Sequence, residues 1–199
     1  MIKLYEFALS GNCHKVRLML SLLGLSYTSV PVNGSSREHK SPEFLAMNPF
    51  GQVPVLKDGD TVIRDSQAIL VYLAHQYGGE QWWPIDAVTL AHITAWLSTV
   101  ANEVARGPNL LRLHHKFGRG SINLEVAQQA TDMLLNIMDE RLTSHDWIAV
   151  DAPSIADIAL YPYIALAAEG KVDLSLYESV LAWEKRIQAL PGYVGMQGM

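Results

Sequence analysis

The chain has 199 residues, of which 49% are hydrophobic and 18% are charged, and its formal net charge is −5. This composition is typical of a soluble globular protein with one large domain or two small ones, and the negative charge argues against nucleic acid as a partner. No stretch approaches the length of a membrane span, and no signal peptide is evident. A single cysteine, Cys13, excludes an internal disulfide framework, so we expect a cytoplasmic protein.

The first third of the chain alternates strand and helix patterns. We expect strands at residues 2–7 and 27–32, because short apolar runs there are bounded by turn residues. Between them, apolar residues recur with helical spacing and predict a helix that ends at Gly24. A short helical turn follows at residues 42–46 after a polar loop.

A hairpin comes next, and a proline interrupts its first strand. Residues 53–56 are apolar and include Pro54. Asp58-Gly59 is a two-residue turn signal, and residues 61–63 are expected to form the second strand of the hairpin. Proline inside a strand removes a hydrogen-bond donor, so we expect a cis Val53–Pro54 bond at the start of an edge strand. The free peptide groups of Val53 could pair with an extended peptide, although an ordinary hairpin packed on a helix fits the spacing equally well.

The hairpin leads into the N-terminus of a helix. Asp65 and Ser66 open this helix, which runs to about Gln76, and donors at such a position can gather around an anion. The element order is then β-α-β-α-β-β-α, with the first two strands joined by a crossover and therefore parallel. This order predicts a thioredoxin-like domain over residues 1–77.

The rest of the chain reads as helical. Glycines and a proline mark a linker at residues 78–86, and we predict an all-α domain over residues 87–199. Its first helix is predicted at residues 85–113, with a kink or break at Gly107-Pro108 because proline cannot continue a helix.

Further helices are predicted in the second half. An amphipathic helix is expected at residues 121–143, and Ser154 with Asp157 forms a capping box that opens the next one. A last helix is expected at residues 174–189. The predicted inward stripe of the amphipathic helix comprises Val126, Ala130, Met133, Leu134, Ile137 and Met138.

Two sequence elements resemble those of a known family. NPFGQVPVLKDGD begins at Asn48, and DSQAI begins at Asp65. Together, at this separation, they closely resemble the glutathione-binding segment of the cytosolic glutathione transferases. The likeness extends in outline over the whole chain, and the site is most similar to serine-type members, including phi, theta and bacterial nu classes. It implies a thioredoxin-like domain followed by a helical bundle, glutathione as co-substrate, and a homodimer.

The resemblance also implies which residues are catalytic. Ser10 lies where serine-type transferases carry the hydroxyl that faces the glutathione sulfur, and Asn12 has the spacing of an asparagine that assists it in nu-class enzymes. Ionising a thiol at neutral pH requires a pKa decrease of ~2 units, or ~2.7 kcal/mol. A hydrogen bond to a charged group supplies roughly 1.5–3 kcal/mol and a helix N-terminus about 0.3–1 kcal/mol more. Ser10 would then be a hydrogen-bond donor rather than a nucleophile; the alternative is a plain helix N-cap.

The other glutathione contacts are also implied by the resemblance. His39 and Lys40 would hold the glycyl carboxylate, and Gln52 would reach the same end of the tripeptide. Val53 would bond the cysteinyl backbone, while Asp65 and Ser66 would bind the γ-glutamyl group.

The second substrate is expected to contact the first long helix, which in this family faces the glutathione sulfur. The candidate residues are Arg106, Asn109, Leu110 and Leu113. Arg106 would attract an acidic electrophile unless it belongs to a solvated helix face. The seven histidines show no complete ligand pattern with cysteine or acidic residues, so we predict no metal site.

Four functions are consistent with these residues. The leading one is conjugation of the glutathione thiolate to a hydrophobic electrophile, as in detoxification. A second is disulfide reduction through Cys13, which would lie in the first helical turn, where a thiolate is favoured. A third is a glutathione-dependent isomerase of the maleylacetoacetate or maleylpyruvate type, because Lys15-Val16-Arg17 resembles part of the zeta-class motif. The fourth is a non-enzymatic glutathione-binding interaction module.

Overall fold

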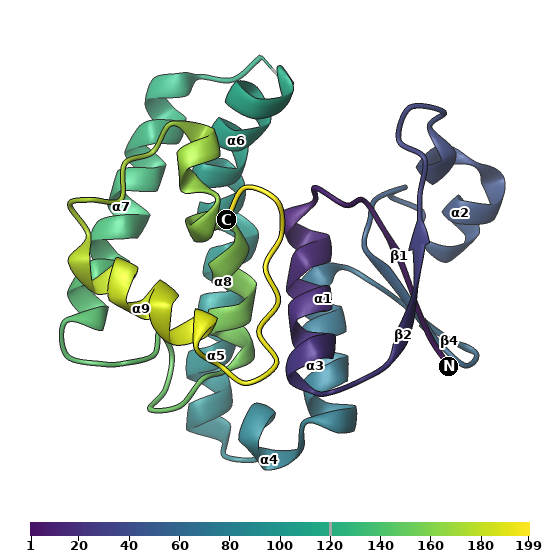
Figure 1. Ribbon diagram of the computed structural model, residues 1–199, viewed down its shortest axis with the longest axis horizontal. Helices are drawn as coiled ribbons and strands as arrows, with labels where there is room; N and C mark the ends of the chain where they lie inside the picture. The colour runs from purple at the N-terminus through teal and green to yellow at the C-terminus, as the bar shows by residue number, and fades with distance from the viewer. Residues whose placement is uncertain (120) are drawn as a thin grey trace.

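A four-stranded sheet with flanking helices is followed by a bundle of helices in the computed structural model, which describes residues 1–119 and 121–199 (Figure 1). The two parts lie side by side, and α-helices from both meet along their boundary (Figure 1). The predicted fold class, a thioredoxin-like domain and an all-α domain, is confirmed.

The sheet has the strand order β2-β1-β3-β4. Its strands are β1 (Ile2–Glu6), β2 (Tyr27–Pro31), β3 (Val55–Asp58) and β4 (Thr61–Arg64). β1 pairs with β2 in parallel, while β3 is antiparallel to both β1 and β4, as the predicted element order requires. β3 therefore lies inside the sheet and is not the edge strand that the sequence predicts. Pro54 precedes the first residue of β3, so it removes no donor from the ladder, and the Val53–Pro54 bond is cis.

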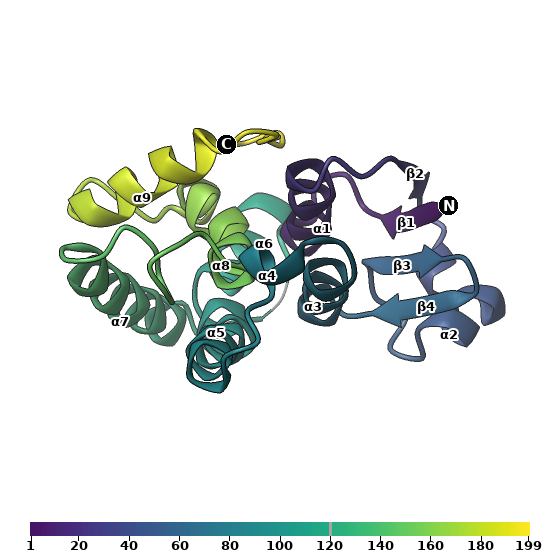
Figure 2. The same ribbon diagram turned by 90° about the horizontal axis from the view of Figure 1, so that it is seen from below.

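Helices cover both faces of the sheet. Successive side chains of a strand point to opposite faces, so the apolar residues of β1 and β3 need packing partners on each side. Leu4 and Leu56 pack with the helices α1 (Gly11–Leu22) and α3 (Ser66–Tyr77) on one face. Val55 packs on the other face with Phe44 of the short helix α2 (Pro42–Met47), preceded by the 3₁₀ turn η1 (Glu38–Lys40). Figure 2 shows α1 and α3 lying between the sheet and the helical part.

The helical part is arranged around one buried helix. α8 packs against α1, α3 and α5, and its residues 155–164 are all buried. The predicted interruption at Gly107-Pro108 is confirmed, because the helix breaks there and resumes at Pro108. The elements are α4 (Gly79–Trp82), α5 (Ala87–Thr99), the π-helical turn η2 (Val100–Val104), α6 (Pro108–Phe117), α7 (Leu124–Leu142), α8 (Ile155–Ala165), η3 (Ala167–Gly170) and α9 (Glu178–Gln188).

Asp157 joins three segments beneath α8. The predicted capping box is present: Ser154 N–H donates to Asp157 Oδ2 at 2.9 Å, and Ser154 Oγ accepts from Ala156 N–H at 3.3 Å. The other carboxylate oxygen of Asp157 accepts from Ile148 N–H and from Trp183 Nε1, each at 2.9 Å. This buried acid therefore fixes α8, α9 and the preceding loop together.

The predicted inward stripe of the amphipathic helix α7 is wrong in part. On α7, Leu134 and Met138 are buried as expected, but Val126, Met133 and Ile137 are at least half exposed. The predicted stripe was wider than the single face that packs on the bundle. Among the described residues, no helix is both long enough and apolar enough to cross a membrane.

Candidate functional site

Ser10 is the N-cap of α1. Its Oγ accepts a hydrogen bond from Cys13 N–H at 3.3 Å, and its backbone has the extended conformation of an N-cap residue. The hydroxyl proton donates to no described residue. Ser10 can therefore cap the helix and at the same time donate to a ligand at the positive end of the helix dipole.

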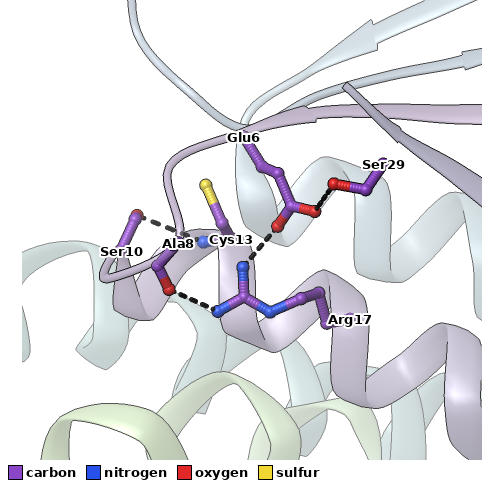
Figure 3. Close-up of polar contacts among 6 residues, drawn as sticks. All are labelled: Glu6, Ala8, Ser10, Cys13, Arg17 and Ser29. Atoms are coloured by element: carbon purple, nitrogen blue, oxygen red, sulfur yellow. Dashed lines mark hydrogen bonds and ion pairs between the residues drawn. The ribbon is translucent and has the colours of Figure 1, made fainter. Parts of the chain in front are cut away.

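Two side chains of β1 and α1 hold the loop that carries Ser10 (Figure 3). Arg17 pairs with the buried carboxylate of Glu6 and also donates to the Ala8 carbonyl at 3.0 Å. Glu6 accepts a further hydrogen bond from Ser29 Oγ of β2 at 2.6 Å. The strand end, the loop and the helix are thus tied together directly beside Ser10.

Five of the predicted site residues line a cavity of about 250 Å³ beside α3. These residues are Asn12, Gln52, Val53, Asp65 and Ser66. Asn48, which is buried, shapes this cavity by donating to the Gln52 carbonyl at 2.8 Å and accepting from Phe50 N–H at 3.1 Å.

Asp65 and Ser66 form the wall of this cavity at the start of α3. Asp65 has a positive φ of 75°, which is uncommon outside glycine, and its Oδ1 caps the helix by accepting from Gln67 N–H and Ala68 N–H. Oδ2 is left to meet a cation. Ser66 donates to Asn12 Oδ1 at 3.3 Å, which links the start of α3 to the start of α1.

His39 and Lys40 do not line the same cavity. The Lys40 ammonium donates to the Phe50 carbonyl at 2.8 Å, and the His39 ring packs edge-on against Phe7 with centroids 5.5 Å apart. The pKa of His39 is lowered by loss of solvation and then by the charges of Lys40, Arg37 and Arg119. The loop that carries both residues lies beside the site rather than inside it.

Ser10 does not line the 250 Å³ cavity but lines a second one, of about 700 Å³. Asn109 and Leu113 of α6 line it, as predicted for second-substrate residues. The other two candidates lie elsewhere: Arg106 is exposed and pairs with Glu103 at 2.6 Å, and Leu110 packs against the core. The break before α6 turns the helix so that only part of the predicted face reaches the cavity.

Cys13, in the first turn of α1 after Ser10, is fully buried. Burial raises the pKa of its thiol to about 11, although the Ser10 hydroxyl acts in the opposite direction. A thiol of this kind is a poor nucleophile, because the reactive form is the thiolate.

A third and smaller cavity, of about 170 Å³, lies between α1 and η2. Lys15 lines it although the residue is only 1% exposed, and its Nζ lies 5.1 Å from the centroid of the Tyr163 ring. Burial lowers the pKa of Lys15 to about 7, while the nearby Asp65 carboxylate partly offsets this effect.

Comparisons with known proteins agree with this geometry. Residues 4–81 match the glutathione S-transferase N-terminal domain, and residues 108–191 match the glutathione S-transferase C-terminal domain. Glutathione S-transferase 3 of Zea mays is 31% identical, over 96% of this chain and 91% of that protein. The chain belongs to the glutathione S-transferase family.

Two further proteins are similar to this chain over nearly their whole length. The disulfide-bond oxidoreductase YfcG of Escherichia coli K12 is 30% identical, over 96% of this chain and 92% of that protein. The crystal structure of a glutathione S-transferase from Xanthobacter autotrophicus has a TM-score of 0.92 and 30% identity, and covers 100% of this chain and 98% of that chain. The relatives therefore include a protein named for a second type of reaction.

Sequence reasoning missed several residues around this candidate site. Arg64 stacks over the Phe50 ring at 4.8 Å beside the 250 Å³ cavity, and Arg112, Phe117 and Tyr163 line the 700 Å³ cavity. These side chains come from segments far apart in the chain, and no local spacing pattern marks them. Among the described residues, no group of three or more His, Cys, Asp or Glu side chains could hold a metal ion.

Proposed function

We propose that this member of the glutathione S-transferase family conjugates the glutathione thiolate to a hydrophobic electrophile. The proposal rests on the position of Ser10, whose hydroxyl lies at the N-terminus of α1 and at the wall of the 700 Å³ cavity and donates to no residue that the structure describes. The Ser10 hydroxyl would donate to the sulfur and stabilise its thiolate. The thiol proton would be released to solvent, and the thiolate sulfur would then form a bond to the electrophilic carbon as the bond from that carbon to its leaving group breaks.

We further propose that glutathione occupies the 250 Å³ cavity. Asp65 Oδ2 would meet the γ-glutamyl ammonium, Ser66 would bind the adjacent carboxylate, and the peptide groups of Val53 would pair with the cysteinyl backbone. Asn12, which follows Ser10 by two residues, also lines this cavity. It would help to bring the glutathione sulfur close to the Ser10 hydroxyl.

The glycyl end of glutathione would lie near Gln52, His39 and Lys40. Lys40 would have to exchange its bond to the Phe50 carbonyl for the glycyl carboxylate, which is a stronger acceptor because it is charged. We propose this exchange as the local change on binding.

A second candidate function is disulfide reduction, which is favoured by the relative that is named a disulfide-bond oxidoreductase. Here the bound glutathione thiolate would attack a disulfide sulfur, form a mixed disulfide, and release the other sulfur as a thiolate. The burial of Cys13 argues against that residue as the attacking group.

We also propose how the parts are organised and assembled. Residues 1–77 would form the glutathione-binding domain and residues 87–199 the substrate domain, joined by residues 78–86, which include α4. α3 and α5 would line a two-fold interface in a cytoplasmic homodimer with a role in detoxification. A monomer mass by light scattering at micromolar concentration would contradict the dimer.

One screen separates the candidate reactions. The protein and glutathione are assayed with a chloronitroarene, an organic disulfide, a hydroperoxide and maleylacetone. The proposal expects turnover of the chloronitroarene; turnover of maleylacetone alone would indicate an isomerase. Glutathione binding without any turnover would indicate a binding module.

A further inference from the structure

The 700 Å³ cavity combines an apolar wall with an excess of positive charge. Phe7, Leu113, Phe117 and Tyr163 provide aromatic and aliphatic surface, and Ser10 lies on the same wall. Such a cavity suits a flat apolar molecule that must bring one carbon close to a sulfur held at Ser10.

The positive charge begins at the buried guanidinium of Arg112. Its Nε donates to Glu169 at 2.6 Å and its Nη2 donates to the Leu9 carbonyl at 3.0 Å. Glu169 also pairs with Lys116, so two cations share one carboxylate. Among the described residues, the charges of these two cations therefore exceed that of the carboxylate they share by one.

Arg119 adds a second positive charge. Its guanidinium carbon lies 6.0 Å from the centroid of the Phe117 ring, against 5.2 Å for that of Arg112, so both cations flank the same aromatic side chain. No acidic oxygen of a described residue lies within 4.0 Å of the Arg119 guanidinium. Arg119 is exposed and can reorient toward a bound anion.

Negative charge on the cavity wall is already compensated. Glu6 is the only acidic residue among those that line it, and this carboxylate is held by Arg17 and Ser29. The chain as a whole has a net charge of −5, so the charge on this cavity wall is opposite in sign to that of the whole protein. A local excess of one charge in a partly enclosed cavity attracts substrates of the opposite charge.

We propose that this cavity selects electrophiles that carry a carboxylate, which Arg119 and Arg112 bind while the apolar body of the molecule lies against Phe117. The inference rests on the proposed function, because it names the substrate class of the same site. Guanidinium groups bind carboxylates through charge-assisted hydrogen bonds, and here both of them lie on the wall of a cavity that Ser10 also lines.

Two electrophiles that differ only in charge test the proposal. A chlorodinitrobenzoate, with its carboxylate para to chlorine, is compared with the corresponding uncharged amide. In both, the glutathione sulfur forms a bond to the ring carbon, and the carbon–chlorine bond breaks with release of chloride. Each kcat/KM is divided by the uncatalysed rate constant with glutathione, which removes the difference in intrinsic reactivity.

We expect the wild-type protein to prefer the benzoate by roughly ten- to hundredfold, the factor that corresponds to a hydrogen bond to a charged group. Arg119→Gln should reduce this preference at least ~tenfold, and Arg119→Lys should retain part of it. Arg186→Gln, which removes an arginine of α9 that pairs with Asp146 away from the cavity, is the matched control and should keep the full preference. Equal normalised rates for both electrophiles, or a preference unchanged by Arg119→Gln, would overturn the inference.

A binding measurement separates this inference from the proposed function. Dinitrobenzoate and dinitrobenzamide lack the chlorine and do not react, so calorimetry reports their affinity without catalysis. Tighter binding of the benzoate that is lost in Arg119→Gln supports the inference even if no conjugation is seen, in which case only the proposed reaction fails. Conjugation of both electrophiles with no difference in affinity supports the reaction and overturns the inference.

Discussion

Arg112 of α6 donates a hydrogen bond to the carbonyl of Leu9, the residue that precedes Ser10, at 3.0 Å. The two residues are 103 positions apart, and the bond joins the helical part of the molecule to the loop that carries the proposed catalytic hydroxyl. The same guanidinium is fixed by Glu169. The helical part therefore positions the Ser10 loop as well as forming the wall of the cavity.

Arg112→Ala should lower both stability and activity. Removing the guanidinium leaves the Leu9 carbonyl without its donor and Glu169 with one cation instead of two, and a buried polar group that loses its hydrogen bond costs about 1–3 kcal/mol. Arg112→Lys keeps a positive charge for Glu169 but loses the fork that also reaches Leu9. We expect the lysine variant to melt close to the wild type while its kcat falls and its pH–rate profile moves to higher pH. A lysine variant with wild-type kcat and pH profile would show that the contact is structural only.

Asp65→Asn separates charge from helix capping. Asparagine can still accept hydrogen bonds from Gln67 N–H and Ala68 N–H, but it carries no charge for a γ-glutamyl ammonium. We expect glutathione affinity to fall by an amount equivalent to roughly 2–5 kcal/mol, with little change in melting temperature. Asp65→Ala should weaken binding similarly and lose ~1 kcal/mol of stability as well. Calorimetry with glutathione checks both variants, and unchanged affinity in Asp65→Asn would place the tripeptide elsewhere.

Several local signals in the sequence agree with the structure. The capping box of Ser154 and Asp157, the break at Pro108 and the start of α3 at Asp65 each depend on a few neighbouring residues. The position of β3 inside the sheet could not be read in this way, because strand order is decided by pairing with β1, some fifty positions earlier.

The candidate site likewise contains residues that local motifs predict and residues that they do not. Ser10, Asn12, Asp65 and Ser66 stand in short motifs; the last three line the 250 Å³ cavity, whereas Ser10 lines the 700 Å³ cavity. Arg112 and Phe117 belong to a helix whose orientation is set by the break at Gly107, so their approach to Leu9 and Ser10 had no signal in the spacing. The alternative role for Cys13 depended on exposure, which only packing determines.

Cys13 should be unreactive in the folded protein. Its thiol is fully buried and its pKa is raised to about 11, so the thiolate is scarce at neutral pH. We expect iodoacetamide to label it at neutral pH only after denaturation, and Cys13→Ala to leave conjugation nearly unchanged. Rapid labelling of the native protein, or a glutathione adduct on Cys13 by intact-mass spectrometry, would instead support the reductase through this residue.

Lys15→Met should stabilise the protein most near neutral pH. In the unfolded chain Lys15 keeps its ordinary pKa of 10.5, whereas burial lowers the folded value to about 7. Between these values the unfolded state binds more protons, so this group makes folding less favourable as the pH falls from 10.5 toward 7. Since one pKa unit corresponds to about 1.4 kcal/mol, we expect a gain of about 1–3 kcal/mol near neutral pH that shrinks as the pH rises.

Thermal melts of the Lys15 variant should be compared with those of Lys185→Met, which changes an exposed lysine of α9. The control should show no such pH-dependent difference from the wild type. A Lys15→Met variant that is less stable than the wild type at every pH would mean that the buried ammonium makes a net favourable contact with Tyr163 or Asp65.

We propose that the Ser10 hydroxyl stabilises the glutathione thiolate. Titration of the bound thiol through the ultraviolet absorbance of its thiolate, in the wild type, Ser10→Ala and Ser10→Thr, tests this role. We predict a wild-type pKa below the free thiol value of about 8.5, an increase of about 1–2 units in Ser10→Ala, and a value close to the wild type in Ser10→Thr. Identical pKa values in the wild type and Ser10→Ala would contradict the claim.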